Sequence, residues 1–473
     1  MKTSTFLCSL LLLAFAPEPL HGAEPIKNVL FLIADDLNCD LGCYGVSEMR
    51  TPNIDRLAQR GVRFDRAYCQ FPLCSPSRAS LLTGRRPNST GVLSNPGAKS
   101  PVSPHFRETI PDTVTLPQLF KKGGWFAARV GKLFHYGVPN DIGTSSLDDF
   151  QSWDLCINPR GLDREIHKDI FSMTPGQFGG TVSWLAAPGE DREHTDGIAA
   201  TEAVKLLERF KQRGENFFLA VGFYRPHTPY VAPKKWFDLY PLDKITLPAL
   251  SDDDRARSPV PAYRSSKKDQ DEMNDEQRKL AIQAYHASTS FMDAQVGVVV
   301  ETLDRLGLAK DTIVVFTSDH GYHLADHGLW QKQSLFERSA RVPLIIAGPE
   351  GRNAGKTANA VVELIDVYPT LAELTGLEAP KYLEGASLVP ALNDPSTKIK
   401  PGAFTQVRRG NVDGCSVRTD RWRYTEWDGG AKGAQLHDEL ADRSESTNLA
   451  AEPTHAATVA ELKAMLAKIQ AVR

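Results

Sequence analysis

The residues of this 473-residue chain that could carry chemistry are acidic, basic and imidazole side chains placed directly after short apolar runs. The runs at 28–34, 125–130, 217–223 and 312–318 are followed, in that order, by Asp35-Asp36, by Lys132 and His135, by His227, and by Asp319-His320. Ligands of open α/β sheets bind beyond the carboxyl ends of the strands. We therefore expect these side chains to converge at one edge of one sheet.

Three of these residues, Asp35, Asp36 and Asp319, could together hold a hard cation. An Asp pair after a strand is also typical of a turn or a helix cap, so no single pair is sufficient. Ca²⁺ takes oxygen ligands in flexible geometry, which suits carboxylates from separate strands. His320 beside them leaves Mg²⁺, Mn²⁺ or Zn²⁺ open. The chain has too few histidines and suitable thiolates for a dedicated zinc cage.

Several cations are expected near this cluster. Each could be a solvated or capping residue on its own, but together beside a metal they favour a tetrahedral oxyanion, a phosphate or sulfate ester. They are Arg78, Lys132, His135, His227 and Lys332. The formal net charge is −3, so affinity for an anion must come from such a local cluster. The same balance makes nucleic acid an unlikely partner.

Cys74 lies in the segment PLCSPSRAS, residues 72–80. Ser75 can cap a helix and Pro76 can occupy its first position, which would place Cys74 at a helix N-terminus, where negative charge is stabilised. Pairing, metal binding, nucleophilic attack and modification all remain open for this thiol. A plain thiolate nucleophile would need an adjacent base and no hard cation.

The elements that must position these residues alternate between strands and helices. The runs at 28–34, 217–223, 312–318 and 342–348 predict buried parallel strands, and 125–130 predicts a weaker one. The pattern over 276–306 predicts a helix ended by Gly307. The expected fold is an α/β sandwich with a large, mostly parallel sheet.

The N-terminus predicts export. Lys2, the apolar run 6–16 and a small-residue exit at Ala23 are typical of a signal peptide over residues 1–23, with a retained anchor as the alternative. No other run is long enough to span a membrane. A bacterial periplasm or the cell exterior is the expected location. The cysteines left after loss of Cys8 form no dense disulfide framework, and the pairing among Cys39, Cys43, Cys69, Cys156 and Cys415 stays open.

The C-terminal part predicts a small α+β subdomain. Segments 414–427 and 434–450 indicate strands and a turn, and 457–472 indicates a helix. The stretch 393–402 is the expected joint. We therefore divide the chain into a catalytic domain, 24–395, and a C-terminal subdomain, 396–473.

The motif Cys74-x-Pro76-x-Arg78, followed by ASLLTGRRP, resembles the signature of the type I, formylglycine-dependent sulfatases. The resemblance covers nearly the whole chain and is closest to iduronate-2-sulfatases and their bacterial relatives. It includes ADDL, GCYG, TPNIDRLA, GKLFH, GFYRPHTPY, TSDHGYHLADHGLWQK and RVPLI. The charged insertion 251–278 is not matched. The resemblance implies an alkaline-phosphatase-like fold.

The resemblance also implies a mechanism. A maturation enzyme converts Cys74 to formylglycine, whose hydrate binds Ca²⁺ together with Asp35, Asp36, Asp319 and His320. Asp319 helps to deprotonate the hydrate, which attacks sulfur. Arg78, Lys132 and Lys332 hold the sulfate oxygens, and His227 binds sulfate or protonates the leaving sugar oxygen. His135 takes the proton that lets the sulfated intermediate collapse to the aldehyde.

The implied substrate is a sulfated saccharide that carries a uronic acid. Its carboxylate would need further cations, and we expect some from Arg225 and from the insertion residues Arg255, Arg257 and Arg264. The alternatives are a sulfatase for aryl, choline or neutral-sugar sulfates, a phosphodiesterase or phosphonate hydrolase of the same fold, and a binding protein whose cysteine is never matured.

Overall fold

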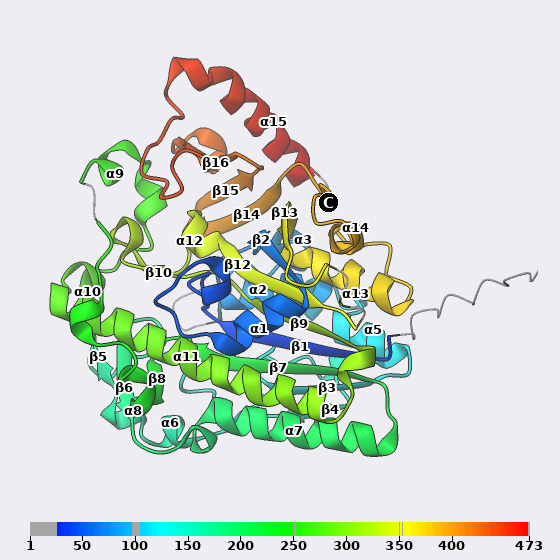
Figure 1. Ribbon diagram of the computed structural model, residues 1–473. Coiled ribbons are helices and arrows are strands. Elements are labelled where there is room, and N and C mark those ends of the chain that lie inside the picture. The colour runs from blue at the N-terminus through cyan, green and yellow to red at the C-terminus, as the bar shows by residue number, and fades with distance from the viewer. Residues whose placement is uncertain (1–25, 97–104, 250–251, 350, 352, 472–473) are drawn as a thin grey trace, which may run out of the picture.

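The computed structural model describes residues 26–96, 105–249, 252–349, 351 and 353–471, so the predicted signal peptide, 1–23, lies outside the described residues. Its centre is an eight-stranded sheet in the order β13-β2-β12-β9-β1-β7-β3-β4 (Figure 1). The strands are β1 (Asn28–Asp35), β2 (Val62–Tyr68), β3 (Phe126–Gly131), β4 (Leu155–Ile157), β7 (Phe217–Pro226), β9 (Thr312–Ser318), β12 (Arg341–Ala347) and β13 (Thr357–Glu363).

Helices cover both faces of this sheet. One face packs on α1 (Pro52–Arg60), α7 (Thr195–Arg213) and α11 (Asp275–Arg305) through residues such as Leu207 and Val296. The other packs on α2 (Cys74–Thr83), α5 (Leu116–Lys122) and α13 (Val367–Thr375) through residues such as Phe120 and Leu371. Central strands buried on both faces must be apolar throughout, which explains their continuous hydrophobic runs. The predicted sandwich is confirmed.

The direction of one strand was not as expected. β1 pairs in parallel with β7 and β9, and β3 pairs in parallel with β7 and β4. By contrast, β12, predicted as a parallel strand over 342–348, runs antiparallel to both β9 and β2. The connection from Ser318 to Arg341 contains no helix long enough to cross the sheet, so the chain re-enters from the edge at which β9 ended. An apolar run indicates burial but not direction.

The C-terminal part forms a separate antiparallel sheet, β14-β15-β16-β17. Its strands are β14 (Ala403–Arg409), β15 (Val412–Arg418), β16 (Trp422–Trp427) and β17 (Ala434–Asp438). The amphipathic helix α15 (Ala456–Ala471) covers it through Leu462 and Leu466 (Figure 1). The predicted strands and helix are present here.

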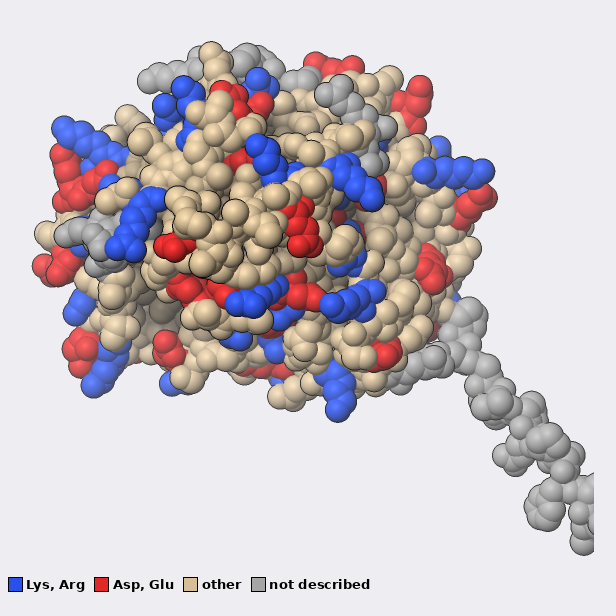
Figure 2. All heavy atoms as spheres, turned by 90° about the horizontal axis from the view of Figure 1, so that it is seen from above, with Lys and Arg blue, Asp and Glu red and all other residues tan. Residues whose placement is uncertain are grey.

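Three further features bear on function. Within the described part of the chain no helix is both long and apolar enough to cross a membrane. The six cysteines of that part are all free of disulfides. Figure 2 shows acidic and basic side chains interspersed over one face of the molecule, with no large area of a single sign. Recognition of an anion therefore depends on a local cluster of cations.

Candidate active site

The aligned ends of β1, β7 and β9 build the site. Asn28 of β1 is level with Phe217 of β7 and with Thr312 of β9, so the three strands start and end together. The chain leaves them at Asp35, at Pro226 and at Ser318. The residues that follow are thereby brought to one edge of the sheet, as predicted.

The backbone after β1 is strained. Asp36 has φ +65, in the left-handed region that residues other than glycine rarely adopt. Its N–H donates to Asp319 Oδ1 at 3.1 Å, and its carbonyl accepts from the Tyr285 hydroxyl at 2.8 Å. These contacts hold a conformation that turns the side chain toward the ends of the neighbouring strands. Such strain is typical of a functional position.

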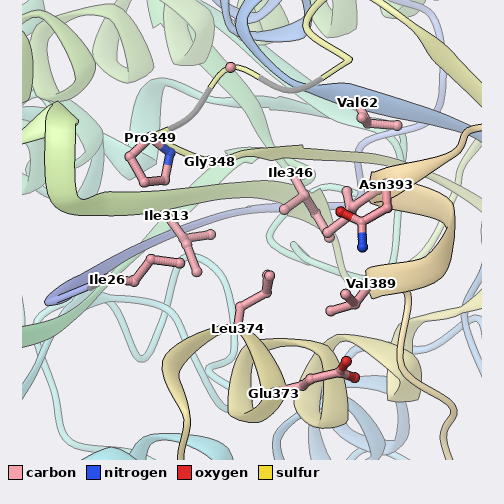
Figure 3. Close-up of a pocket in the computed structure, with 12 residues that line it drawn as sticks. Ile26, Val62, Ile313, Ile346, Gly348, Pro349, Glu373, Leu374, Val389 and Asn393 are labelled. Carbon is pink, nitrogen blue, oxygen red and sulfur yellow. The ribbon is translucent and has the colours of Figure 1, made fainter. Parts of the chain in front are cut away.

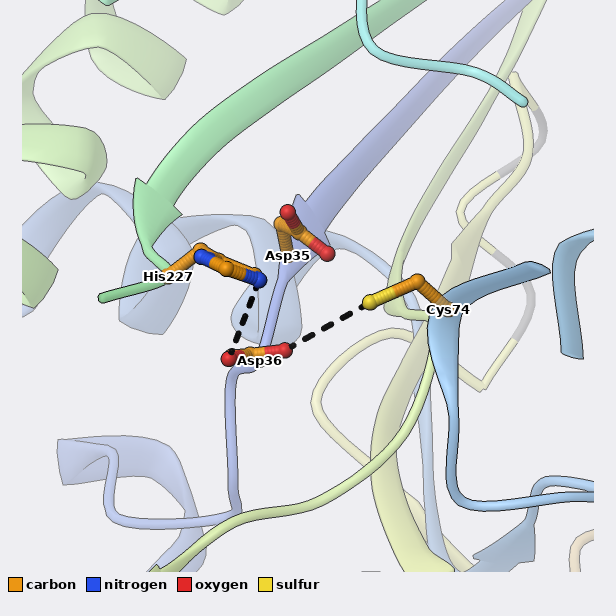
Figure 4. A group of neighbouring side chains, drawn as sticks. All are labelled: Asp35, Asp36, Cys74 and His227. Carbon is orange, nitrogen blue, oxygen red and sulfur yellow. Dashed lines mark hydrogen bonds and ion pairs between the residues drawn. The ribbon is translucent and has the colours of Figure 1, made fainter. Parts of the chain in front are cut away.

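The carboxylates, His320 and Cys74 form one buried cluster with His227. Figure 4 shows four of its members, Asp35, Asp36, Cys74 and His227. Asp35, Cys74, Asp319 and His320 place one ligand atom each within 4.8 Å of one another, and so do Asp35, Asp36, Cys74 and His227. His320 Nδ1 lies 2.9 Å from the Gly321 carbonyl, which fixes a proton on Nδ1 and leaves Nε2 facing the cluster. Burial opposes protonation of this ring, but Asp319 and Cys74 raise the pKa of His320 to about 9, so Nε2 must release a proton before it binds a cation. The predicted metal-binding residues are thus brought together.

Burial and neighbouring charges act in opposite directions on the pKa values of the aspartates in this cluster. Burial opposes ionisation of Asp35, but the charges of Lys132 and Arg78 hold its pKa well below the ordinary value. Burial raises the pKa of Asp36 to about 7. Its Oδ2 is buried and has no hydrogen-bond partner among the described residues. An unpaired buried carboxylate oxygen is costly unless a cation binds it.

Cys74 lies at the first position of α2, two residues before the predicted helix start. Leu73 is the extended N-cap and its carbonyl accepts from Ser77 N at 3.0 Å. The expected Ser75 cap is wrong, because α2 already begins at Cys74 and Leu73 is its N-cap. Pro76 is the third helical residue. The first N–H groups of a helix have no acceptor within it, so proline costs no hydrogen bond there. Lys332 Nζ lies 3.2 Å from the thiol, and His320 Nε2 lies 3.5 Å from it. Burial opposes ionisation, but Lys332 and Lys132 lower the pKa of Cys74.

Arg78 is fully buried beneath the cluster. Nε donates to Asp319 Oδ2 at 2.9 Å and Nη2 to Asp35 Oδ1 at 3.2 Å. Nη1 donates to the carbonyls of Lys132 and Leu133 at 2.6 and 3.1 Å. The sequence predicts that Arg78 binds sulfate oxygens, but its donors are directed at the protein. It holds two carboxylates of the cluster in place.

Two ammonium groups contact the same carboxylates. Lys132 Nζ donates to Asp35 Oδ2, and Lys332 Nζ donates to Asp36 Oδ1 at 2.5 Å. Lys132 reaches this position because β3 and β7 approach closely. A Cβ on Gly222 would lie 1.9 Å from the Lys132 carbonyl, and one on Gly131 would lie 2.2 Å from the Gly222 carbonyl. Only glycine fits at both places.

Two histidines flank the cluster. His227 Nε2 lies 3.7 Å from Asp36 Oδ2, and its Nδ1 contacts the Thr228 carbonyl at 2.5 Å. Burial and the charge of Lys332 lower the pKa of His227 well below its ordinary value. Burial and Lys132 lower that of His135 to about 3, and its Nδ1 is buried without a described partner. Both rings are therefore neutral at neutral pH in this arrangement.

A cavity of about 390 Å³ opens onto these groups. Its basic lining residues are His135, His227, Arg264, Lys267, Lys332 and Arg409. No Asp or Glu is among the described residues that line it. Sequence reasoning found four of these six but missed Lys267 and Arg409. Arg409 comes from the C-terminal sheet, and no motif relates it to the strand ends.

Arg225 does not face the cavity, contrary to the predicted role in substrate binding. It is 1% exposed, and its Nη2 donates to Asp163 Oδ2 at 2.5 Å. Its Nη1 donates to the carbonyls of His227 and Pro229. The guanidinium therefore holds the turn that carries His227, and its described contacts are all with the protein. A buried carboxylate 62 residues earlier in the chain could not be anticipated from the local sequence.

The three arginines of the insertion 251–278 differ in whether they line the cavity. Arg264 lines the cavity, in agreement with the expectation. Arg255 instead lies over the Tyr263 ring and pairs with Asp271 at 3.4 Å. Arg257 is not among the residues that line the cavity. One of the three expected arginines is therefore placed near a substrate.

A second cavity, of about 340 Å³, lies at the opposite edge of the sheet (Figure 3). Ile26, Val62 and Ile313 line it at the beginnings of β1, β2 and β9, and Glu373 of α13 is its acidic lining residue. Ligands of parallel sheets bind at the other ends of the strands. The first cavity, at the carboxyl ends of the strands, is therefore the candidate active site.

The sequence matches two family models. The Sulfatase model matches residues 27–377, and the model of the N-sulphoglucosamine sulphohydrolase C-terminal region matches residues 325–472. A sulfatase from Formosa agariphila is 36% identical over 100% of this chain and 93% of its own length. Iduronate 2-sulfatase from Mus musculus is 34% identical over 86% of each chain.

The comparison with solved structures gives the same family of folds. A structure titled as a 2-O GAG sulfatase superimposes with a TM-score of 0.73 and 26% identity, covering 94% of this chain and 91% of its own. Phosphonate monoester hydrolase of Agrobacterium radiobacter gives a TM-score of 0.76 over 94% and 95%, but its 22% identity shows the fold alone. The fold is that of the alkaline-phosphatase-like sulfatases. With one family model covering most of the chain and relatives alike over nearly its full length, the protein belongs to the sulfatase family and is a sulfuric ester hydrolase.

Proposed function

We propose that this enzyme removes sulfate from a saccharide that carries a uronic acid, using formylglycine made from Cys74 and one Ca²⁺. The observation that carries the proposal is the position of Cys74. It is fully buried at the start of α2, within 3.5 Å of both Lys332 Nζ and His320 Nε2. A thiol enclosed by carboxylates and cations is unsuited to pairing, and it lies where a nucleophile would meet an anion.

The donor set fits a hard cation. Asp35, Asp36 and Asp319 offer carboxylate oxygens, His320 Nε2 faces them, and Asp36 Oδ2 has no hydrogen-bond partner among the described residues. These residues would hold Ca²⁺, which binds oxygen ligands with variable geometry. A bound cation would neutralise the carboxylates and polarise a sulfate oxygen. Carboxylates engaged in this way would leave Lys132 and Lys332 available to the substrate.

The remaining roles follow from protons and charge. Lys132 and Lys332 would bind sulfate oxygens and stabilise the charge that develops on the leaving group. Arg78 positions Asp35 and Asp319. His227 donates from Nδ1 to Thr228, so it needs a second proton on Nε2 to act as an acid. The charge of a bound sulfate ester would favour that proton.

His135 would act as a base. Its ring lines the cavity, and its buried Nδ1 has no described partner to occupy the lone pair or proton. A neutral imidazole can accept a proton from the hydroxyl of sulfated residue 74, and loss of that proton lets the C–O bond to sulfate break. The aldehyde is restored and sulfate leaves. A plain serine or cysteine ester has no such route.

The substrate class draws support from the relatives and from the cavity. A relative named iduronate 2-sulfatase aligns over 86% of this chain, and the cavity is lined by cations beyond those placed for sulfate. We also propose that a maturation enzyme oxidises Cys74. Export through residues 1–23 would bring the enzyme to polysaccharide outside the cytoplasm.

Two measurements test the proposal. Mass spectrometry of the peptide that contains residue 74 should show an aldehyde in place of the thiol in protein produced with a maturation enzyme. Matured protein should release sulfate from 2-sulfated uronate saccharides faster than from neutral-sugar or choline sulfates. An unmodified Cys74 in fully active enzyme would refute the formylglycine assignment. Preference for a neutral sulfated sugar would refute the substrate class.

A further inference from the structure

Arg409 presents an unusual surface to the active-site cavity. It is the last residue of β14, and its Nη1 donates to Gln333 Oε1 at 2.6 Å. Its Nε and Nη2 atoms are buried and have no hydrogen-bond partner among the described residues. Buried donors without partners are rare and generally indicate a missing ligand or water. The free edge of the guanidinium is the Nε–Nη2 edge.

A second unpaired donor lies on the same cavity. Lys267 Nζ, which can only donate, lies 3.4 Å from Gln331 Oε1. This contact directs the other end of the amide away from Lys267, and Gln331 Nε2 is buried without a described partner. Gln331 and Gln333 both adopt positive φ, +68 and +71, on either side of Lys332. The strained segment therefore presents the free donor Gln331 Nε2 on one side of Lys332, and on the other side its acceptor Gln333 Oε1 holds Arg409.

Electrostatics favours an anion here. Lys267, Arg264 and Arg409 line the cavity, which has no described acidic lining residue. Burial lowers the pKa of Arg409 to about 10, with no carboxylate to offset it, so the group is charged at neutral pH. Burial lowers the pKa of Lys267, Asp269 opposes this shift, and the charges of Lys332 and Arg409 lower the pKa further. Lys267, Lys332 and Arg409 thus line the same cavity and lie close enough for their charges to affect one another.

We propose that Arg409, with Gln331 and Lys267, binds a carboxylate of the substrate at a subsite separate from the sulfate that is cleaved. The inference rests on the proposed function and identifies the residue that makes the enzyme prefer an acidic sugar. Nε and Nη2 lie parallel on one edge of a planar group and match the two oxygens of a carboxylate. Two oxygens of a second sulfate could accept from the same edge, so the substrates of the test are chosen to separate a carboxylate from a second sulfate. The subsite explains why an arginine from the C-terminal sheet lines this cavity.

The test compares variants on matched substrates. Arg409→Ala should lower kcat/KM for a 2-sulfated uronate glycoside by about 10- to 100-fold, the usual effect of losing a charged hydrogen bond. It should change kcat/KM by less than about threefold for the glycoside whose carboxylate is reduced to an alcohol, and for a small aryl sulfate. Arg409→Lys, which keeps the charge but not the parallel donors, should fall between. Arg408→Ala, in an exposed residue paired with Asp413, is the control and should match the wild type on all three substrates.

Stability and binding separate this role from others. Because Nε and Nη2 of Arg409 are unpaired and Nη1 donates only to Gln333, Arg409→Ala should lower the stability by no more than the loss of one hydrogen bond, about 1 kcal/mol. A clearly larger loss would show a structural role and overturn the inference. Equal losses on all substrates, or a loss that follows a second sulfate instead of the carboxylate, would also overturn it. Calorimetry with the Cys74→Ala variant and the 2-sulfated uronate glycoside needs no turnover. If the double variant Cys74→Ala, Arg409→Ala binds this glycoside more weakly than Cys74→Ala alone, the subsite is supported even if the matured enzyme proves to act on another ester. Unchanged binding rejects the subsite.

Discussion

Cys74 shows how one residue can be unpaired for a chemical reason. Its thiol is buried and forms no disulfide, and its neighbours are Lys332, His320 and Asp36. Ammonium, imidazole and carboxylate groups around a single side chain stabilise charge but add little to packing. The site therefore favours reactivity at position 74 over a structural role.

Cys74→Ala should abolish sulfate release, by at least about a thousandfold, because no other group occupies the position of the nucleophile. The free energy of unfolding should change by no more than about 1 kcal/mol, since one small group is removed. Sulfate release and urea unfolding measure the two effects. Cys415→Ala, on the C-terminal sheet, should retain full activity. Turnover by Cys74→Ala near the wild-type rate would remove residue 74 from the mechanism.

Arg225→Ala tests the corrected role of this arginine. Its ion pair with Asp163 is almost fully buried, with both side chains no more than 2% exposed, and removal of one partner leaves an uncompensated charge. We expect a loss of about 3–5 kcal/mol in the free energy of unfolding and similar losses of activity on uronate and aryl sulfates. Arg160→Ala, in an exposed pair with Glu165, should have almost no effect. A stable Arg225→Ala protein with a defect on uronate substrates alone would restore the original assignment.

At the scale of elements, the site depends on where strands end and how closely they pass. β1, β7 and β9 deliver acids and histidines because they start level and have similar lengths. β3 adds Lys132 only because Gly131 and Gly222 let two backbones touch. Gly131 has φ +76, so it relieves both a steric and a conformational restriction.

Gly131→Ala should therefore damage the site through the backbone. The left-handed conformation costs about 1 kcal/mol, and a Cβ 2.2 Å from the Gly222 carbonyl adds displacement of β3 and of Lys132. Activity should fall with stability. Gly124→Ala is a matched control, because Gly124 has φ +83 but no heavy atom within 4 Å. It should lose only about 1 kcal/mol and keep its kcat. Identical behaviour of the two variants in melting and kinetics would contradict the proposed contact.

The sequence predicts those parts of the site that follow from strand ends. Asp35, Asp319 and His227 could be placed together because parallel strands share an edge, and burial made the strands recognisable. The direction of β12 could not be predicted, because an apolar run reads the same in both orientations. The partners of Arg78 and Arg225 depend on buried carboxylates far along the chain. Arg409 required the packing of the C-terminal sheet on the cavity, for which no local pattern exists.

At the scale of the whole molecule, a buried ionic cluster joins the C-terminal sheet to the rest of the fold. Glu337 precedes β12, and its side chain pairs with Arg423 of β16 and with Arg418 of β15 at 3.4 Å. Its backbone N–H donates to Glu445 at 2.6 Å. This cluster holds the sheet that carries Arg409 against the part of the chain that carries Cys74.

The cluster should make stability depend on pH. Burial opposes ionisation of Glu337, but the charges of Arg418 and Arg423 lower its pKa from 4.5 to about 2. Stability from this depressed pKa is present above pH 4.5 and is lost as the pH falls toward 2. Glu337→Gln should therefore destabilise by on the order of 3 kcal/mol at pH 7, and the difference from the wild type should shrink by pH 3. Urea unfolding at pH 7, 4.5 and 3 measures it, with exposed Glu301→Gln as control. A difference that is constant with pH would exclude the charge as its cause.

Chelation tests whether a bound cation takes part in the same balance of charge at the active site. Arg78, Lys132 and Lys332 already offset the charges of Asp35, Asp36 and Asp319, so we expect chelated protein to stay folded. It should nevertheless melt lower, because a ligand at 100 times its Kd adds about 2.7 kcal/mol to the folded state. Activity should fall in parallel, and Ca²⁺ should restore both. Asp319→Asn should lose the response of the melting temperature to Ca²⁺, whereas Asp304→Asn, in an exposed pair with Arg60, should keep it. Recovery by Mg²⁺, Mn²⁺ or Zn²⁺ but not by Ca²⁺ would change the identity of the ion. Full activity and an unchanged melting temperature after complete chelation would show that the lysines and Arg78 alone balance the carboxylates.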